Sequence, residues 1–264
     1  MKNRVLIDAC PVFLRLIIGL GSGIFFSALA FADSPEKDAG NWQQVAPPNY
    51  PLVRKWVSSN RYPWRTIGRV NLAGRGHCSG ILVGDRQVLT SAHCLWNQRN
   101  GQWFPAQYIT FVAGEEQEEY QAYSNAISYS IAEGFSPHAA NQPDTIRYDW
   151  AVLTLQHPLG ETLGYVKPAA TTQIRAKQNI FQAGYRADRA DVLTVERDCH
   201  IARLYDDSRV FSTSCKTLSG DSGGPVLIHH NQQWTLAGIH RGRTDKNQSL
   251  VVSINNIRGL IASD

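Results

Sequence analysis

The chain has 264 residues, of which 43% are hydrophobic and 18% charged, a balance that excludes an intrinsically disordered protein. Its net charge of +4 is too small for the basic surface of a nucleic-acid-binding protein, so we expect no nucleic-acid partner. The length is sufficient for one large domain or two small ones.

The first 32 residues have the features of an export signal. Lys2 and Arg4 give a positive start, an apolar run follows at Leu16–Phe31, and residues 30–32 form a small-x-small cleavage site. The alternative is a permanent membrane anchor, but the run is shorter than the roughly 20 residues of a spanning helix. We therefore predict a signal peptide at 1–32, a secreted or periplasmic protein, and no membrane association after signal removal.

Removal of this leader changes the charge and the cysteine count. Three basic residues and one acidic residue leave with it, so the net charge of +4 falls to +2. One of the five cysteines leaves as well, and the remaining four form the even set expected of a protein that folds in an oxidising space. None of them stands in a Cys-x-x-Cys pair, and we expect neither a metal nor a cofactor.

Residues 33–61 are polar and irregular. A proline-containing stretch at 46–51 is typical of an extended linker, and basic residues follow at Arg54, Lys55 and Arg61. Two interpretations stay open: a propeptide with a processing site, or an ordered N-terminal extension that lies on the domain surface.

From residue 62 onward, short apolar runs alternate with turn residues. Ten runs of four to seven residues, rich in Val, Ile, Leu and Thr, are predicted to be strands. They are Thr66–Leu72, Ser79–Val83, Gln87–Thr90, Tyr108–Ala113, Ala151–Leu155, Gln178–Ala183, Val192–Val195, Pro225–Ile228, Trp234–Ile239 and Leu250–Ile254. Only Asn255–Ala262 has helix-like spacing. This pattern indicates an all-β barrel or sandwich with a short C-terminal helix.

Three segments contain the residue types that nucleophilic catalysis needs. They are Leu89–Cys94, Tyr148–Leu153 and Ser219–Pro225. A serine hydroxyl is a weak nucleophile, so an imidazole such as that of His93 must take the proton of Ser222 during attack. A carboxylate such as Asp149 fixes the imidazole tautomer and stabilises the imidazolium. The backbone N–H groups of Gly220 and Ser222 are predicted to form an oxyanion hole.

Each segment taken alone has another explanation. Asp149 also fits an ordinary turn residue before a strand, and Asp144 is a rival acid, although no apolar strand follows it. His93 beside a cysteine is equally compatible with a structural histidine. The Gly-x-Ser-x-Gly pattern at Ser222 matches the nucleophile elbow of α/β-hydrolases, but that fold places its Asp and His after the serine.

Together, the segments resemble the T-A-A-H-C, D-[IW]-A-[LV]-L and G-D-S-G-G-P motifs of the trypsin/chymotrypsin-like serine proteases. Ser91 is the one departure, and the order His93, Asp149, Ser222 is also that of the family. The resemblance implies two packed antiparallel six-stranded β-barrels in a protease domain at 62–264.

The resemblance assigns about 62–160 to the first barrel, with His93 and Asp149, and about 161–264 to the second, with Ser222. It implies a monomeric serine endopeptidase that hydrolyses protein or peptide substrates through an acyl-enzyme intermediate. A homologue that only binds partners is the rival hypothesis, but no triad residue is missing.

The spacing of the four cysteines leaves three disulfide pairings open, and the resemblance to the family implies one of them. Cys78 and Cys94 flank the segment that ends at His93 and correspond to the histidine-loop disulfide of the family. Cys199 and Cys215 then pair in the second barrel.

Two features separate the chain from digestive trypsins. No basic residue followed by Ile-Val-Gly-Gly stands near the domain start, so activation by a new N-terminus inserted beside Asp221 is not expected. Leu218 stands four residues before the serine, where a cysteine is usual.

The segments around Ser222 and His240 are more similar to the bacterial glutamyl-endopeptidase branch. There, residues at the positions of Thr217 and His240 bind a substrate carboxylate, and Lys216 adds positive charge nearby. This implies cleavage after Glu, with Asp slower. The alternative is that His240 is a packed strand residue and the basic side chains point to solvent.

Two further features bear on binding. Arg241 and Arg243 depart from the smaller residues usual after that histidine and are expected to narrow the pocket. The acidic residues within 115–119 suggest a calcium loop, but without the Gly and Asp pattern of such a loop we expect a solvated hairpin tip.

Overall fold

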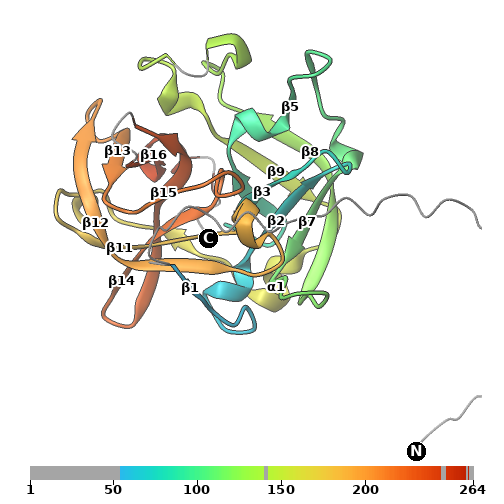
Figure 1. Ribbon diagram of the computed structural model, residues 1–264, viewed down its shortest axis with the longest axis horizontal. Helices are drawn as coiled ribbons and strands as arrows, with labels where there is room; N and C mark the ends of the chain where they lie inside the picture. Colours follow the sequence, from blue (N-terminus) through green and yellow to red (C-terminus); the bar gives the residue numbers. More distant parts are fainter. Residues whose placement is uncertain (1–53, 140–141, 245–247, 260, 262–264) are drawn as a thin grey trace, which may run out of the picture. The chain divides into compact units, whose positions relative to one another are not determined.

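Six antiparallel strands close the first barrel in the order β2-β3-β4-β9-β8-β7 (Figure 1). The strands are β2 (Ile67–Leu72), β3 (His77–Leu82), β4 (Gln87–Thr90), β7 (Ile109–Ala113), β8 (Ala122–Ile131) and β9 (Ala151–Leu155). Side chains alternate between the two faces of a strand, and in β7 the inward positions Ile109, Phe111 and Ala113 are completely buried. These observations come from a computed structural model that describes residues 54–139, 142–244, 248–259 and 261.

The second barrel has the order β12-β11-β14-β15-β16-β13 and is closed by pairing of β13 with β12. Its strands are β11 (Asn179–Gly184), β12 (Thr194–Tyr205), β13 (Val210–Thr213), β14 (Pro225–His230), β15 (Gln233–Arg243) and β16 (Ser249–Ser253). Two short strands are added to it: β1 (Lys55–Trp56) pairs with β12, and β10 (Lys167–Pro168) runs parallel to β15.

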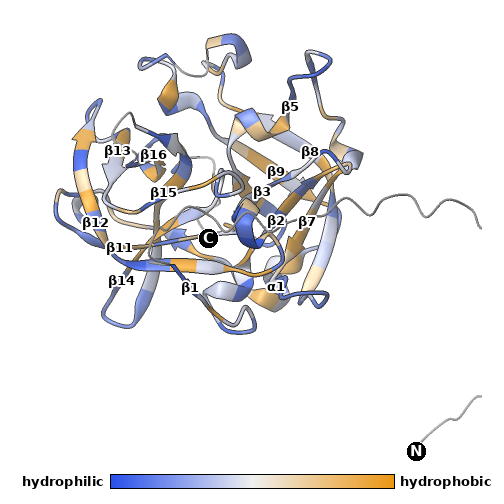
Figure 2. Cartoon of the chain, in the orientation of Figure 1, coloured by the Kyte–Doolittle hydropathy of each residue, from blue (hydrophilic) through white to orange (hydrophobic). Residues whose placement is uncertain are grey.

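The all-β, two-barrel fold predicted from the resemblance is therefore confirmed. Hydrophobic residues follow the strands of both barrels, and hydrophilic residues concentrate in the connecting loops (Figure 2). Among the described residues, no helix has the length and hydropathy needed to cross a membrane. The predicted signal peptide at 1–32 lies outside the described residues.

In the part of the chain that the structure describes, the helices are short. One α-helix, α1 (Leu159–Leu163), stands between the two barrels in the sequence. The 3-10 helices are Trp64–Thr66, Ala92–Leu95, Ala106–Tyr108, Pro137–Ala139, Ile146–Tyr148, Thr171–Gln173, Ala187–Arg189 and Ile254–Asn256, and a small hairpin is made by β5 (Trp96–Asn97) and β6 (Gln102–Trp103). The helix expected at Asn255–Ala262 begins as the last of these 3-10 turns and continues as a turn over 257–259.

One disulfide cross-links each barrel. Cys78 in β3 pairs with Cys94, and Cys199 in β12 pairs with Cys215. These are the pairs that the family resemblance implies. Each closes a loop with a sequence separation of 16 residues, for which the chain-entropy model gives about 3 kcal/mol of stabilisation.

Candidate active site

Asp149 holds His93 in one orientation. His93 lies on the 3-10 helix that follows β4, and Asp149 lies just before β9, the strand that pairs with β4. His93 Nδ1–H donates to Asp149 Oδ2 at 2.7 Å, and the backbone N–H of His93 donates to Asp149 Oδ1 at 2.9 Å. An ionised carboxylate only accepts hydrogen bonds, so the proton of the neutral imidazole is on Nδ1 and Nε2 is left as the proton acceptor.

The burial of the two side chains suits a base and its orienting acid. Asp149 is completely buried, whereas 30% of the His93 side chain is exposed. Burial alone raises the pKa of Asp149, but the His93 hydrogen bonds and the charge of Arg241 outweigh it and hold the pKa below its ordinary value. Asp149 is therefore an anion at neutral pH. The rival acid, Asp144, is exposed.

Arg241 has a contact that the sequence did not predict. Its Nε–H donates to Asp149 Oδ2 at 3.1 Å, and only 10% of its side chain is exposed. The expectation was that Arg241 narrows a specificity pocket. The structure places it between the buried acid and a pocket of about 360 Å³ beside His93. That pocket is lined by His93, Trp96, Gln98, Pro137, Arg241, Gly242 and Arg243.

Ser222 stands at the centre of a tight turn between two glycines with positive φ. Gly220 has φ +90° and Gly223 has φ +78°, values that L side chains seldom adopt. A Cβ atom on Gly220 would clash with the carbonyl oxygen of Tyr185, and one on Gly223 with Thr90 Oγ1. Ser222 itself is half-buried, and its Oγ has no hydrogen-bond partner among the described residues.

The same turn leaves two backbone donors open. Among the described residues, the N–H groups of Gly220 and Ser222 make no hydrogen bond, whereas those of Asp221, Gly223 and Gly224 do. The carbonyl of Gly220 is held on the other side by Ser79 Oγ–H at 2.8 Å. Two unpaired N–H groups, one of a serine and one two residues before it, are the arrangement that binds a developing oxyanion.

Thr217, His240 and Ser249 form a buried chain of hydrogen bonds. Thr217 Oγ1–H donates to Asp221 Oδ2 at 3.0 Å, so His240 Nε2–H must donate to Thr217 Oγ1 at 2.6 Å. His240 Nδ1 then accepts from Ser249 Oγ–H at 2.7 Å. Burial lowers the pKa of His240 to about 4, so the ring is neutral at pH 7.

These contacts place the predicted specificity residues. Thr217 and His240 lie together, while the side chain of Lys216 is exposed. Ser249 was missed by the sequence reasoning, because nothing in its local pattern marks it.

Ser91, the one departure from the family motif, links the two barrels. Its Oγ–H donates to the carbonyl of His240 at 3.1 Å, and the N–H of Gly223 donates to the same carbonyl at 2.7 Å. The His93 segment of the first barrel and the Ser222 turn of the second therefore meet at a single carbonyl group of β15.

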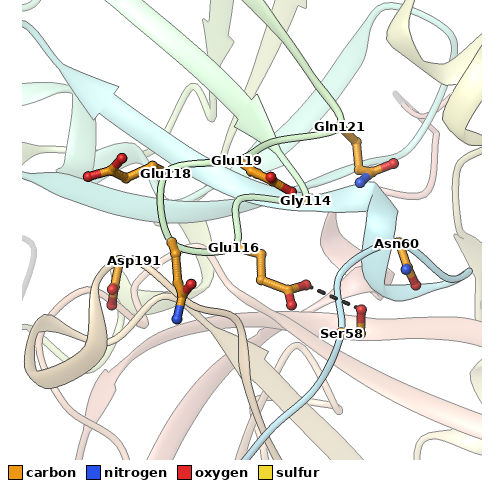
Figure 3. Close-up of a pocket in the computed structure, with 9 residues that line it drawn as sticks. Ser58, Asn60, Gly114, Glu116, Glu118, Glu119, Gln121 and Asp191 are labelled. Carbon is orange, nitrogen blue, oxygen red and sulfur yellow. Dashed lines mark hydrogen bonds between the residues drawn. The ribbon is translucent and has the colours of Figure 1, made fainter.

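Of the acidic residues at 115–119, Glu116, Glu118 and Glu119 border a different pocket, of about 870 Å³, which none of the predicted catalytic residues lines (Figure 3). Glu115 accepts a hydrogen bond from Arg69 at 2.7 Å, and Glu116 accepts from Ser58 at 3.2 Å. Two of these carboxylates are thus already hydrogen-bonded to other side chains of the protein. Elsewhere in the described part of the chain, two groups of His, Cys and Glu side chains are spaced like metal ligands, but each includes both cysteines of a disulfide, whose sulfurs are not thiolates.

Comparisons with known proteins find relatives among the serine proteases. The model of the Trypsin family matches residues 55–256. A glutamyl endopeptidase of Bacillus licheniformis is 24% identical over 183 residues, which are 69% of this chain and 54% of that protein. The serine protease SP24D of Anopheles gambiae is 29% identical over 171 residues, which are 58% of this chain and 59% of that protein.

A solved structure of a Glu endopeptidase in complex with MPD has the same fold, with a TM-score of 0.65 and 21% identity. It covers 80% of this chain, which in turn covers 97% of that chain. The chain spans about half the length of the curated relatives it matches. Because the family model covers well over half of the sequence, the chain belongs to the trypsin family.

Proposed function

We propose that this chain is an exported serine endopeptidase with His93, Asp149 and Ser222 as its catalytic triad. One observation carries the proposal. A buried Asp149 orients an accessible His93, and β15 joins the His93 segment to a serine turn in which the N–H groups of Gly220 and Ser222 are unpaired.

Each group has a defined task in this mechanism. His93 Nε2 takes the proton of Ser222 Oγ as that oxygen attacks the substrate carbonyl carbon, and Asp149 stabilises the imidazolium that forms. The N–H groups of Gly220 and Ser222 donate to the oxyanion, a contribution of roughly 10²–10³ in rate per donor. His93 then protonates the leaving amine, and water hydrolyses the acyl-enzyme by the reverse sequence of proton transfers.

For specificity we propose cleavage after Glu, with Asp slower. The support is the hydrogen-bonded pair of Thr217 and His240, together with the names of the glutamyl endopeptidases to which the chain is similar. A Glu side chain that enters here would take over hydrogen bonds that Thr217 and His240 now make with each other. Such bonds become charge-assisted, which favours a carboxylate over an amide.

Export to the periplasm or the medium is supported by the leader-like sequence at 1–32 and by two disulfides, which persist in oxidising compartments. The proposed substrates are proteins or peptides, and the proposed state is a monomer.

A fluorophosphonate probe tests the activity directly. The purified chain should be labelled at Ser222 and should cut a mixed peptide library after Glu. Ser222→Ala should be folded and unlabelled. A folded wild-type chain that is not labelled would instead support a homologue that only binds partners.

A further inference from the structure

The segment that precedes the first barrel is joined to the second barrel and to the acidic loop. Lys55 and Trp56 pair with β12, and the N–H of Val57 donates to the carbonyl of Leu193 at 3.2 Å. Glu116 then receives a hydrogen bond from Ser58 Oγ–H (Figure 3) and, at 3.1 Å, a second one from the N–H of Ser59. These contacts fix the position of the residue just before β1, which is Arg54.

Arg54 is a buried cation beside two buried carboxylates. Only 2% of its side chain is exposed. Its Nη1–H donates to Asp221 Oδ1 at 2.5 Å, and its Nε lies 3.7 Å from Glu196 Oε2. The side chain of Asp221 is completely buried and that of Glu196 is 4% exposed. A buried carboxylate without a partner is strongly unfavourable, so the cation of Arg54 offsets part of the cost of burying these two side chains.

Both carboxylates hold the backbone that leads into the oxyanion hole. Asp221 Oδ2 accepts from the N–H of Leu218 and from Thr217 Oγ1–H, each at 3.0 Å. Glu196 Oε2 accepts from the N–H of Lys216 at 3.0 Å. Asp221 is also the residue between Gly220 and Ser222, whose N–H groups are the proposed oxyanion donors. Any rotation of the Asp221 side chain therefore disturbs the segment that presents them.

We propose that Arg54 is a positioning residue for this site: its guanidinium fixes Asp221 and Glu196 and thereby holds the N–H groups of Gly220 and Ser222 toward the oxyanion. The inference rests on the proposed function. Because Arg54 is an internal residue, the active conformation needs no newly freed N-terminus beside Asp221. The mature enzyme must begin at or before residue 54, which favours an ordered N-terminal extension over a propeptide that ends at residue 61.

The test compares Arg54→Met and Arg54→Lys with the matched control Lys55→Met, whose side chain is exposed in the same segment. The readouts are the rate of fluorophosphonate labelling, kcat and KM on a Glu-containing peptide, the titrated fraction of active sites, and the thermal melting temperature. We expect Lys55→Met to match the wild type. In folded Arg54→Met, kcat should fall by about 10²-fold or more, the loss typical of one oxyanion donor, with a smaller change in KM.

Arg54→Lys keeps the charge but not the planar fork, so its kcat should lie between those of Arg54→Met and the wild type. A merely structural role for Arg54 predicts a different result. Fewer active sites would titrate in Arg54→Met, but each would retain the wild-type kcat and labelling rate. That outcome would overturn the inference.

A second measurement uses only the wild type, so it tests the inference even if the Arg54→Met variant fails to fold. The exported, fully active wild-type chain is analysed by intact mass and N-terminal sequencing. We expect every active species to contain Arg54, and an active species that begins after residue 54 would contradict the proposal. A wild-type chain that is folded but unlabelled at Ser222 would instead refute the proposed function, and this result is distinguishable because it appears before any variant is compared.

Discussion

Arg241 donates a hydrogen bond from Nε to Asp149 Oδ2, the same carboxylate oxygen that receives the Nδ1 proton of His93. The acid of the proposed triad therefore has two cationic or proton-donating partners, one from each barrel. Since Arg241 also lines the pocket beside His93, one side chain connects that pocket to the buried acid.

Replacement of Arg241 by alanine should lower kcat, because Asp149 loses one charge-assisted hydrogen bond and its pKa rises. Hydrogen bonds to charged groups contribute about 1.5–3 kcal/mol, so we expect a decrease of about tenfold or more in kcat/KM. Arg243→Ala is the control, since Arg243 lines the same pocket but has no hydrogen bond to Asp149 among the described contacts. An Arg241→Ala variant with wild-type kcat would show that the contact has no role in catalysis.

His240 should make the folded state sensitive to mild acid. Its pKa in the folded protein is about 4, below the roughly 6.5 of an unfolded histidine. The unfolded state therefore binds the proton first as the pH falls, and stability decreases between pH 6.5 and 4. At about 1.4 kcal/mol per pH unit, this loss amounts to about 3.5 kcal/mol.

Urea unfolding of the wild type and His240→Gln across this range measures the effect. The free energy of unfolding of the wild type should fall more steeply with decreasing pH than that of the variant. Parallel curves for the two proteins would mean that His240 is not buried as a neutral ring.

Ser91→Ala restores the residue that the family motif carries at this position and removes one hydrogen bond between the barrels. The carbonyl of His240 keeps its bond from the N–H of Gly223, so no buried acceptor is left unsatisfied. We expect a loss of about 1 kcal/mol in the free energy of unfolding and near wild-type kcat. Chemical denaturation and steady-state kinetics on one preparation test both parts, and a large loss of kcat would assign Ser91 a direct role in the site.

Most of the fold could be predicted because its strands carry continuous apolar runs. The predicted bounds of β4 and β9 match those observed, and those of the other predicted strands except β12 differ by a few residues at their ends. β8 was missed since half of its residues are exposed, and its two buried positions hold the small side chains Ser124 and Ala126. β13, a short strand, was missed as well.

β12 was predicted only as Val192–Val195, but it continues to Tyr205. The charged residues from Glu196 onward conceal the strand in the sequence. One of them, Glu196, is buried beside Arg54. Its partner is distant in the sequence, so the sequence alone does not predict that this charged position lies inside a strand.

The candidate site likewise contains residues that the sequence predicts and residues that it does not. His93, Asp149 and Ser222 stand in local motifs that chemistry and resemblance both select. Arg54 and Arg241 contact carboxylates 167 and 92 positions away, and no local spacing pattern predicts such a contact.

The central claim, that Ser222 is the nucleophile of an endopeptidase, is tested most directly by comparing peptide hydrolysis by the wild type and Ser222→Ala. Both are first shown to be folded by their melting curves. The triad predicts that the rate falls by about 10⁴–10⁶ in the variant. It also predicts that fluorophosphonate adds one label to the wild type, at Ser222, and none to the variant. Hydrolysis at the wild-type rate by a clean, folded Ser222→Ala preparation would contradict the account.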